Sequence, residues 1–447
     1  MNDQRATNEF MGNPPPPAQG RSDDKETRMK KALALGTLSL TLAVVLAGTG
    51  DAQKKALGDL VVFNNWSAPA ELGALNVIRT SFQAQGGTWK DITVAHDTGA
   101  SIPLINMLTG GNPPDVFIES SVVLRRELLK QGLLHDFTAY YNSLNVDRFI
   151  PPTVKDAMMV DGKVVSAPLT IHIVGTLFWN IAAAKKAGVN PAAWTSLDAM
   201  FADFPKIRKA GLIPLAIGAQ KWQLEYLLQS MMVQVSGKLY DDVCGTAPKK
   251  ASLDSPEMRQ ALTYFRRIQK EADAGSANRN WNDTTAMVIR GQALMQLHGD
   301  WMKGEFLAAK KKIGVDFDTR LLPGARGVQV TVDEETFLAP KTPLKNAAQE
   351  ALFKTMLQKN ITEGFSVIKG STPVRLDASV GIDKHAKMVL AALKTPGFGH
   401  PVRNITMDPD YGGAFADLAD TYWNTPDMTP DAFIKQLQAK YDDVFQK

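Results

Sequence analysis

The stretch 60-LVVFNNWSAPAELGALNVIRTSF-82 predicts a buried strand, a loop and a helix in succession. Residues 60–63 form a continuous apolar run, which is typical of a strand that is covered on both faces of a sheet. After the loop, apolar residues recur at helical spacing from Leu72 to Phe82. The stretch therefore predicts a β-α unit whose loop, with Trp66, follows the carboxyl end of a strand.

The same alternation continues beyond this stretch. Strands are expected at 91–95 and 115–118, and helices at 101–108 and 122–131. The order β-α-β-α-β-α favours an α/β fold with a mostly parallel sheet and helices on both faces. Further extended segments are expected at 163–169, 176–180, 213–217, 293–297, 328–332 and 336–339.

Residues 29–52 have the pattern of a secretory signal peptide. Lys30 and Lys31 precede an apolar run at 32–47, and small residues then lead to a cleavage site after Ala52. The run is shorter than the roughly 20 residues that span a membrane. We expect cleavage near Ala52 and a soluble periplasmic protein, with a retained amphipathic anchor as the alternative.

Residues 1–28 are polar and rich in proline, and they could not contribute to a packed core. They are interpreted as a disordered extension or as sequence upstream of the true start at Met29. Neither this segment nor the signal peptide enters the fold prediction.

Composition argues against several classes of function. The net charge is only +4 and is dispersed, which disfavours nucleic-acid binding. The single cysteine, Cys244, excludes an internal disulfide and is expected to be a plain buried or loop thiol. Because no metal-binding spacing, phosphate-binding loop or nucleophile motif occurs, we expect no metal, no cofactor and no catalysis.

The loop after the first strand favours ligand binding. The indole of Trp66 can stack on the apolar face of a pyranose, while Asn64, Asn65 and Glu71 can bond its hydroxyls. Loops at the carboxyl ends of parallel strands are where open α/β folds bind ligands. The alternative is that Trp66 only packs over the end of the sheet.

Four motifs and the export signal resemble one known family. The motifs are LTGGNPPDVF at 108–117, GKVVSAPL at 162–169, GDW at 299–301 and KGSTPVRLD at 369–377. In this order they are similar to the extracellular solute-binding proteins of sugar ABC importers, and most of all to the glucose-type branch. The resemblance covers nearly all of residues 58–440.

The resemblance implies a two-lobe periplasmic-binding-protein fold of type II. The chain would cross three times between the lobes, near 167–169, 321–323 and 357–361. The N-terminal lobe would comprise 53–168 and 323–358, and the C-terminal lobe 169–322 and 359–447.

The resemblance also implies ligand contacts. The implied contacts are the aromatic residues Trp66 and Trp222, the hydroxyl acceptors Glu71 and Asp300, the cation Lys369, and His172 as donor or acceptor. For three of these residues, the alternative is a role without ligand contact. Trp222 would then pack in the core, His172 would be an interior histidine, and Lys369 would be a solvated amine.

Two positions depart from the glucose-type pattern. Ser120 and Arg403 stand where that pattern has histidines. Arginine is a fixed cation that suits carboxylate or phosphate. The ligand is therefore left open among a neutral monosaccharide, a disaccharide and an acidic or phosphorylated sugar.

The resulting functional hypothesis is a monomeric sugar-binding subunit that delivers its ligand to the transmembrane subunits of an ABC permease. One alternative is an exported glycosidase or lyase. The other is a binding protein that serves a chemoreceptor.

Overall fold

The computed structural model describes residues 57–94, 101–118, 121–402 and 407–446, and every structural statement below concerns these residues. The segments 1–28 and 29–52 lie outside the described residues, as do Ser120 and Arg403. Among the described helices, none has the length and the apolar character needed to cross a membrane.

The N-terminal strands and helices follow the predicted alternation. β1 (Gly58–Asn64) pairs in parallel with β2 (Gly87–Thr93) and β3 (Val116–Ile118), and α1 (Pro69–Ala84) and α2 (Ser101–Thr109) connect them. The second strand lies earlier than expected, because Trp89 is buried against Phe82 of α1. The predicted α/β class is confirmed.

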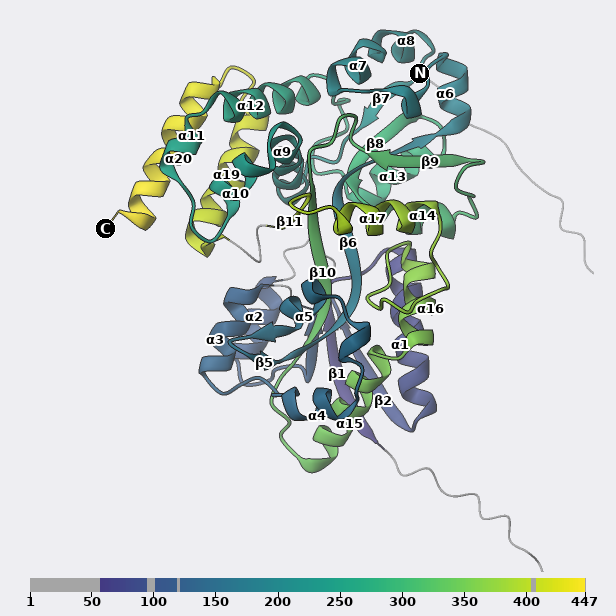
Figure 1. Cartoon of the computed structure of the whole chain (residues 1–447), viewed down its shortest axis with the longest axis vertical. Coiled ribbons are helices and arrows are strands. Elements are labelled where there is room, and N and C mark those ends of the chain that lie inside the picture. The colour runs from purple at the N-terminus through teal and green to yellow at the C-terminus, as the bar shows by residue number, and fades with distance from the viewer. Residues whose placement is uncertain (1–56, 95–100, 119–120, 403–406, 447) are drawn as a thin grey trace, which may run out of the picture. The chain divides into compact units, whose positions relative to one another are not determined.

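Two long strands run side by side between two groups of helices (Figure 1). β6 (Ser166–Asn180) and β10 (Val328–Phe337) pair antiparallel. The sequence predicts two short extended segments in place of each of these strands. β6 continues because its irregular residues coincide with β-bulges: Pro168 lies at a register shift opposite Glu334, and Gly175 has a φ of 91° at another.

The remaining strands complete one mixed sheet. β7 (Ile213–Ala216) is parallel to β8 (Ala293–Gly299), and β8 and β9 (Phe317–Leu321) are antiparallel to β6. Within the described residues, the order is β2-β1-β3-β10-β6-β8-β7, with β9 beside β6 and β11 (Gly399–Pro401) beside β10. β4 (Met159–Val160) and β5 (Lys163–Val164) form a separate pair.

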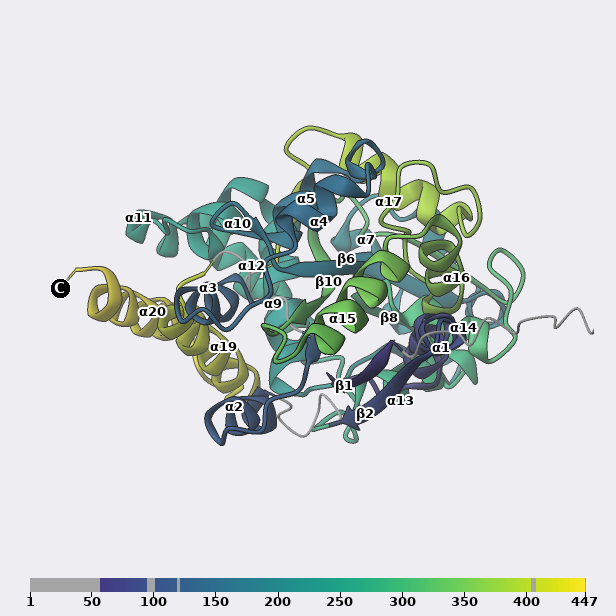
Figure 2. The same ribbon diagram turned by 90° about the horizontal axis from the view of Figure 1, so that it is seen from below.

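Helices flank this sheet (Figure 2). Besides α1 and α2 they are α3 (Val122–Lys130), α4 (Thr138–Ser143), α5 (Pro152–Met158), α6 (Ile181–Ala187), α7 (Leu197–Ala202), α8 (Phe204–Lys209), α9 (Lys221–Val235), α10 (Gly237–Cys244), α11 (Lys250–Leu253), α12 (Pro256–Gln269), α13 (Trp281–Ile289), α14 (Met302–Ala308), α15 (Pro343–Met356), α16 (Lys359–Lys369), α17 (Lys384–Lys394), α19 (Pro409–Asn424) and α20 (Pro430–Phe445).

The two largest hydrophobic clusters lie in different halves of the sheet. One joins α1, α15 and α16 to β1, and the other joins α9, α12, α19 and α20 to β8. Cys244 is buried in the second cluster, where burial raises the pKa of its thiol. Leu72, which was placed on the apolar face of α1, is instead 43% exposed.

A buried ion pair lies on β10. The guanidinium of Arg125 on α3 contacts Glu334 at 2.6 Å, and both side chains are completely buried. Arg125 also donates to the carbonyl oxygen of Ala157 and to Ser166 Oγ, each at 2.9 Å. Burial raises the pKa of Glu334 to about 7 although Arg125 and Ser166 favour its charged form.

The next residue on β10, Glu335, is expected to make stability depend on pH. Glu335 is 1% exposed, and neither of its carboxyl oxygens has a hydrogen-bond partner in the structure. Burial, and then the charge of Asp91, raises its pKa well above the usual value of 4.5. The contribution of Glu335 to stability is therefore fully present below pH 4.5, where the carboxyl is protonated in both the folded and the unfolded state. It is lost as the pH rises from 4.5 through the higher pKa of the folded state.

We therefore expect the Glu335→Gln variant to gain stability relative to wild type as pH rises from 5 to 8. The gain is at most about 1.4 kcal/mol for each pH unit over which only the unfolded state is ionised. Urea unfolding at several pH values measures this difference. Glu127→Gln, at an exposed position of α3, is the control and should follow wild type. Equal pH slopes for Glu335→Gln and wild type would contradict the expectation.

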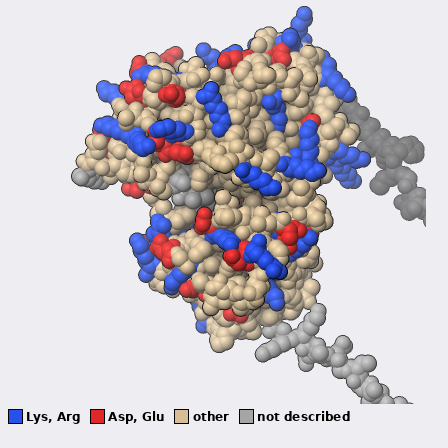
Figure 3. Space-filling view, in the orientation of Figure 1, with Lys and Arg blue, Asp and Glu red and all other residues tan. Residues whose placement is uncertain are grey.

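The molecular surface carries charges of both signs. On the face in Figure 3, Lys and Arg side chains are interspersed with Asp and Glu side chains.

Candidate functional site

The loop after β1 holds Trp66 against the start of α1. The backbone N–H of Trp66 donates to Asn64 Oδ1 at 3.1 Å. The carboxylate of Glu71 accepts hydrogen bonds from the N–H groups of Ser67 and Ala68, both at 3.0 Å. Glu71 thereby satisfies donors that a helix N-terminus leaves free, and it fixes the loop.

Lys369, at the end of α16, contacts Trp66 in this loop and Glu71 in the first turn of α1. Its Nζ lies 3.2 Å from Glu71 Oε1 and 4.4 Å from the centroid of the Trp66 ring. Lys369 is only 2% exposed, and its amine is therefore not the solvated group that the structural alternative supposed. Trp66, 7% exposed, also packs on Phe365. Three predicted contacts thus form one cation–aromatic–carboxylate cluster, which we call the Lys369 cluster.

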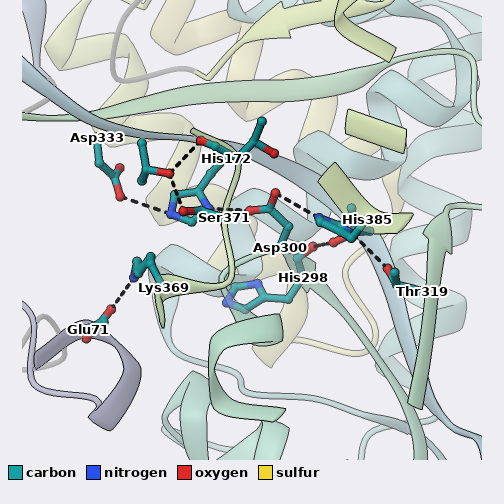
Figure 4. Close-up of polar contacts among 12 residues, drawn as sticks. Glu71, His172, His298, Asp300, Thr319, Asp333, Lys369, Ser371 and His385 are labelled. Carbon is teal, nitrogen blue, oxygen red and sulfur yellow. Dashed lines mark hydrogen bonds and ion pairs between the residues drawn. The ribbon is translucent and has the colours of Figure 1, made fainter. Parts of the chain in front are cut away.

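A second group centres on Asp300, which follows β8 directly. Asp300 Oδ1 accepts a hydrogen bond from His172 Nδ1 on β6, and Oδ2 lies 3.1 Å from His385 Nε2 on α17 (Figure 4). All three residues are completely buried. His385 Nδ1 also lies 3.4 Å from Thr319 Oγ1 on β9. The Asp300 cluster therefore ties together two strands, a strand end and a helix.

Electrostatics keep Asp300 ionised. Burial opposes its charge, but the charges and hydrogen bonds of His172 and His385 outweigh that effect and hold the pKa of Asp300 well below its ordinary value. Burial lowers the pKa of His385 more than the hydrogen bond and charge of Asp300 raise it. In this structure Asp300 has one histidine on each oxygen.

Trp222, on α9, belongs to an aromatic group beside Asp300. Its indole lies 5.2 Å from the ring of His298 and 6.4 Å from that of Trp301, between ring centroids. Trp301 in turn meets the His172 ring edge-to-face at 5.4 Å. Trp222 is half-buried, and its Nε1 donates to Gln220 Oε1 at 3.0 Å. Trp222 is thus incompletely buried and lies next to Trp301, which contacts His172 of the Asp300 cluster.

Helix α14 joins the two clusters. Asp300 and Trp301 precede it, and its Gly304 lies against the Lys369 cluster. A Cβ atom on Gly304 would lie 2.4 Å from the carbonyl oxygen of Lys369 and 2.8 Å from Ala70 Cβ, so only glycine allows this approach. Glu305 Oε1 accepts from the N–H of Ala70 at 3.3 Å. The position of the GDW motif is therefore coupled to the start of α1.

The structure also brings in residues that sequence reasoning missed. They are His298, Tyr226, Asp333 and His385, which surround Asp300, Trp301 and Trp222. Burial lowers the pKa of His298 to about 3, so this ring is neutral. Of these four residues, only His298 had a signal in the sequence, because it lies two residues before Asp300 of the GDW motif. Asp333 and His385 lie far from any motif in the sequence.

The described residues contain no group of three or more His, Cys, Asp or Glu side chains arranged to hold a metal ion. The implied contacts at Ser120 and Arg403 lie outside the described residues and stay predictions.

Comparison with known proteins places the chain in a family. The family model described as "Bacterial extracellular solute-binding protein" matches residues 78–389. The chain belongs to this family. A "Probable sugar-binding periplasmic protein" of Mesorhizobium japonicum is 30% identical over 429 residues, which cover 93% of this chain and all of that protein. A protein of the same description from Brucella suis is 30% identical and covers 82% of this chain and 86% of its own length.

Solved structures of solute-binding proteins share the fold. A chitin oligosaccharide binding protein has a TM-score of 0.73 at 15% identity and covers 87% of this chain and 99% of its own. The solute receptor AcbH, whose title gives an exclusive preference for β-D-galactopyranose, has a TM-score of 0.73 at 16% identity, with coverage of 88% and 99%. These likenesses confirm the two-lobe solute-binding fold.

Proposed function

We propose that this protein is the periplasmic sugar-binding subunit of an ABC importer. Its family consists of extracellular solute-binding proteins, and relatives at 30% identity are described as sugar-binding periplasmic proteins. These names favour a binding protein over the alternative of an exported glycosidase or lyase.

The observation that supports sugar binding best is the pairing of aromatic rings with charged groups in both clusters. Trp66 lies with Glu71 and Lys369, and Trp222 lies beside Trp301, whose ring contacts His172. Aromatic faces stack on the apolar faces of sugars, while carboxylates and ammonium groups bond the hydroxyls. A site with this chemistry suits an uncharged polyhydroxylated ligand.

We assign the two clusters to facing lobes. The predicted N-terminal lobe holds Trp66 and Glu71, and the predicted C-terminal lobe holds Trp222 and Asp300. The packing of α16 against α1, with Ile361 and Phe365 in the same cluster as α1, favours a third crossing after Lys369 rather than at 357–361. A ligand that contacts both lobes only in the closed state shifts the equilibrium towards closure.

The ligand class is proposed more narrowly than the family allows. The proposed ligand is a mono- or small oligosaccharide, bound in a glucose-type site. Ser120 and Arg403 are the two positions at which this chain differs from the glucose-type branch. If Arg403 contacts the ligand, an acidic sugar is favoured. If it does not, a neutral hexose is favoured.

The proposed partners are the transmembrane subunits of the permease. The closed, sugar-loaded monomer delivers its ligand to them after export and removal of the signal peptide. A role in serving a chemoreceptor uses the same binding step, and an adjacent permease gene distinguishes the two.

Ligand-induced stabilisation tests the proposal. We expect the purified protein to gain about 2.7 kcal/mol of unfolding free energy in the presence of its sugar at 100 times the dissociation constant. The panel comprises neutral mono- and disaccharides, uronic acids, sugar phosphates and polyols, with thermal shift as the screen and calorimetry as confirmation. No stabilisation by any sugar of the panel contradicts sugar binding, and turnover of a chromogenic glycoside would favour the enzyme instead.

A further inference from the structure

One nitrogen of His172 is buried without a hydrogen-bond partner. His172 Nδ1 bonds Asp300, whereas Nε2 has no hydrogen bond in the structure although the side chain is only 1% exposed. Since an ionised carboxylate only accepts, Nδ1 must hold a proton. Nε2 is therefore the ring nitrogen that is left for a ligand.

Asp333 lies on the other side of the same ring (Figure 4). Its Oδ2 is 3.5 Å from His172 Nε2, which is too long for a hydrogen bond, and its side chain is 21% exposed. No Lys or Arg side chain pairs with Asp333 among the ion pairs of the described residues. Asp333 therefore offers a carboxylate acceptor, partly open to solvent, beside the unpartnered Nε2.

His172 Nε2 and the Asp333 carboxylate adjoin the aromatic group of the proposed site. Trp301 meets His172 edge-to-face at 5.4 Å, and Tyr226 lies 6.3 Å from Trp301 and 5.9 Å from Trp222. Burial and then the charge of Asp333 raise the pKa of the Tyr226 phenol, so Asp333 lies near this ring too. A ligand stacked on Trp222 would thus lie close to both His172 Nε2 and Asp333.

We propose that Asp333 is a ligand-binding residue that, together with the unpartnered His172 Nε2, hydrogen-bonds two hydroxyls on neighbouring carbons of the sugar. The inference rests on the proposed function and deepens it. One hydroxyl of a vicinal diol donates to the Asp333 carboxylate, and the other can donate to or accept from Nε2, so the diol satisfies both groups at once. Asp333 lies on the crossing strand β10, where a ligand held between the lobes passes close to both of them.

The pairing also determines specificity. A uronic acid brings a carboxylate with no proton to donate, and the charge of Asp333 repels it. Asp333 therefore selects a neutral vicinal diol at this end of the site. This holds whether or not Arg403 contacts the ligand at another position.

Calorimetry on the Asp333→Asn variant tests the inference. The probes are D-glucose, D-galactose, D-xylose and D-glucuronate, followed by the monodeoxy derivatives of the tightest binder. We expect the variant to bind the neutral sugar at least tenfold more weakly and to reduce the preference over D-glucuronate. The loss should be much smaller for the one deoxy sugar that lacks the hydroxyl held by Asp333.

The control variant changes a carboxylate that lies outside the proposed site. Asp318→Asn removes a carboxylate of similar exposure on β9, 16%, which pairs with Lys384 instead. It should bind sugar like wild type. Wild-type affinity in Asp333→Asn, or an equal loss for every deoxy sugar, overturns the role of Asp333 while leaving sugar binding intact. Failure of the wild-type protein to bind any probe or any other sugar overturns the proposed function and this inference together.

Discussion

Replacing Arg125 with leucine is expected to lower the free energy of unfolding by about 3–5 kcal/mol. The substitution leaves Glu334 completely buried beside Ser166, without the guanidinium 2.6 Å away. Isolating a buried charge costs far more than losing a surface pair, because the carboxylate must either stay ionised in a poorly solvated site or take up a proton. Urea unfolding followed by circular dichroism measures the loss.

The neighbouring residue supplies the control. Arg126 makes an ion pair with Asp161 at 3.1 Å, but both side chains are about half exposed, at 44% and 50%. Arg126→Leu should therefore change stability by less than about 1 kcal/mol. Adding Glu334→Leu to Arg125→Leu should recover most of the loss, since no unpaired charge remains. Equal effects of Arg125→Leu and Arg126→Leu would show that the buried pair has no special role.

Replacing Trp222 with alanine is expected to weaken sugar binding by roughly 30-fold or more, equivalent to about 2 kcal/mol. The indole is half-buried against His298 and Trp301, and removing it takes away the stacking face beside the Asp300 cluster. Because the ring is not fully buried, the variant should stay folded at the temperature of the titration. Calorimetry with the sugar identified by the panel measures the change.

An aromatic residue away from the site distinguishes binding from general packing. Tyr140 is also half-buried, packs against Phe353 at 6.3 Å and lies in the α1–α15 cluster. Tyr140→Ala should lower stability but leave affinity within about twofold of wild type. If Tyr140→Ala and Trp222→Ala weaken binding equally, the loss comes from the fold, and Trp222 is not a sugar contact.

Local pattern was enough to predict the first β-α-β units. The apolar run at 60–63 and the helical spacing up to Phe82 depend on neighbours in the sequence, and β1 and α1 form where they were expected. The second strand was displaced by a few residues because Trp89 pairs with Leu60 across the sheet. A long-range pairing of this kind is not visible in a local window.

The two long strands were the largest error in the expected secondary structure. Asp333, Glu334 and Glu335 interrupt an apolar pattern, so the sequence indicated two short strands rather than the single β10. The strand continues because Arg125, more than 200 positions earlier, pairs with Glu334, and because burial raises the pKa of Glu335 and so favours its uncharged form. Local hydrophobicity cannot anticipate a partner from another helix.

The candidate site was recognised in part. The resemblance pointed to Glu71 and Lys369, which meet at 3.2 Å, and to His172 and Asp300, which hydrogen-bond one another. No short pattern surrounds His385 or Asp333, and only the packing of α17 and β10 brings them to the same place. The sequence therefore did not predict the residues that reach the site only through tertiary packing.

A crystal structure of the protein with the tightest-binding sugar of the panel would show whether one ligand contacts both clusters. We expect one sugar in contact with both groups of residues, stacked on Trp222 or Trp66 and hydrogen-bonded by Lys369 or Glu71 on one side and by His172 or Asp333 on the other. A sugar bound elsewhere, or in contact with only one of the two clusters after lobe closure, would contradict it.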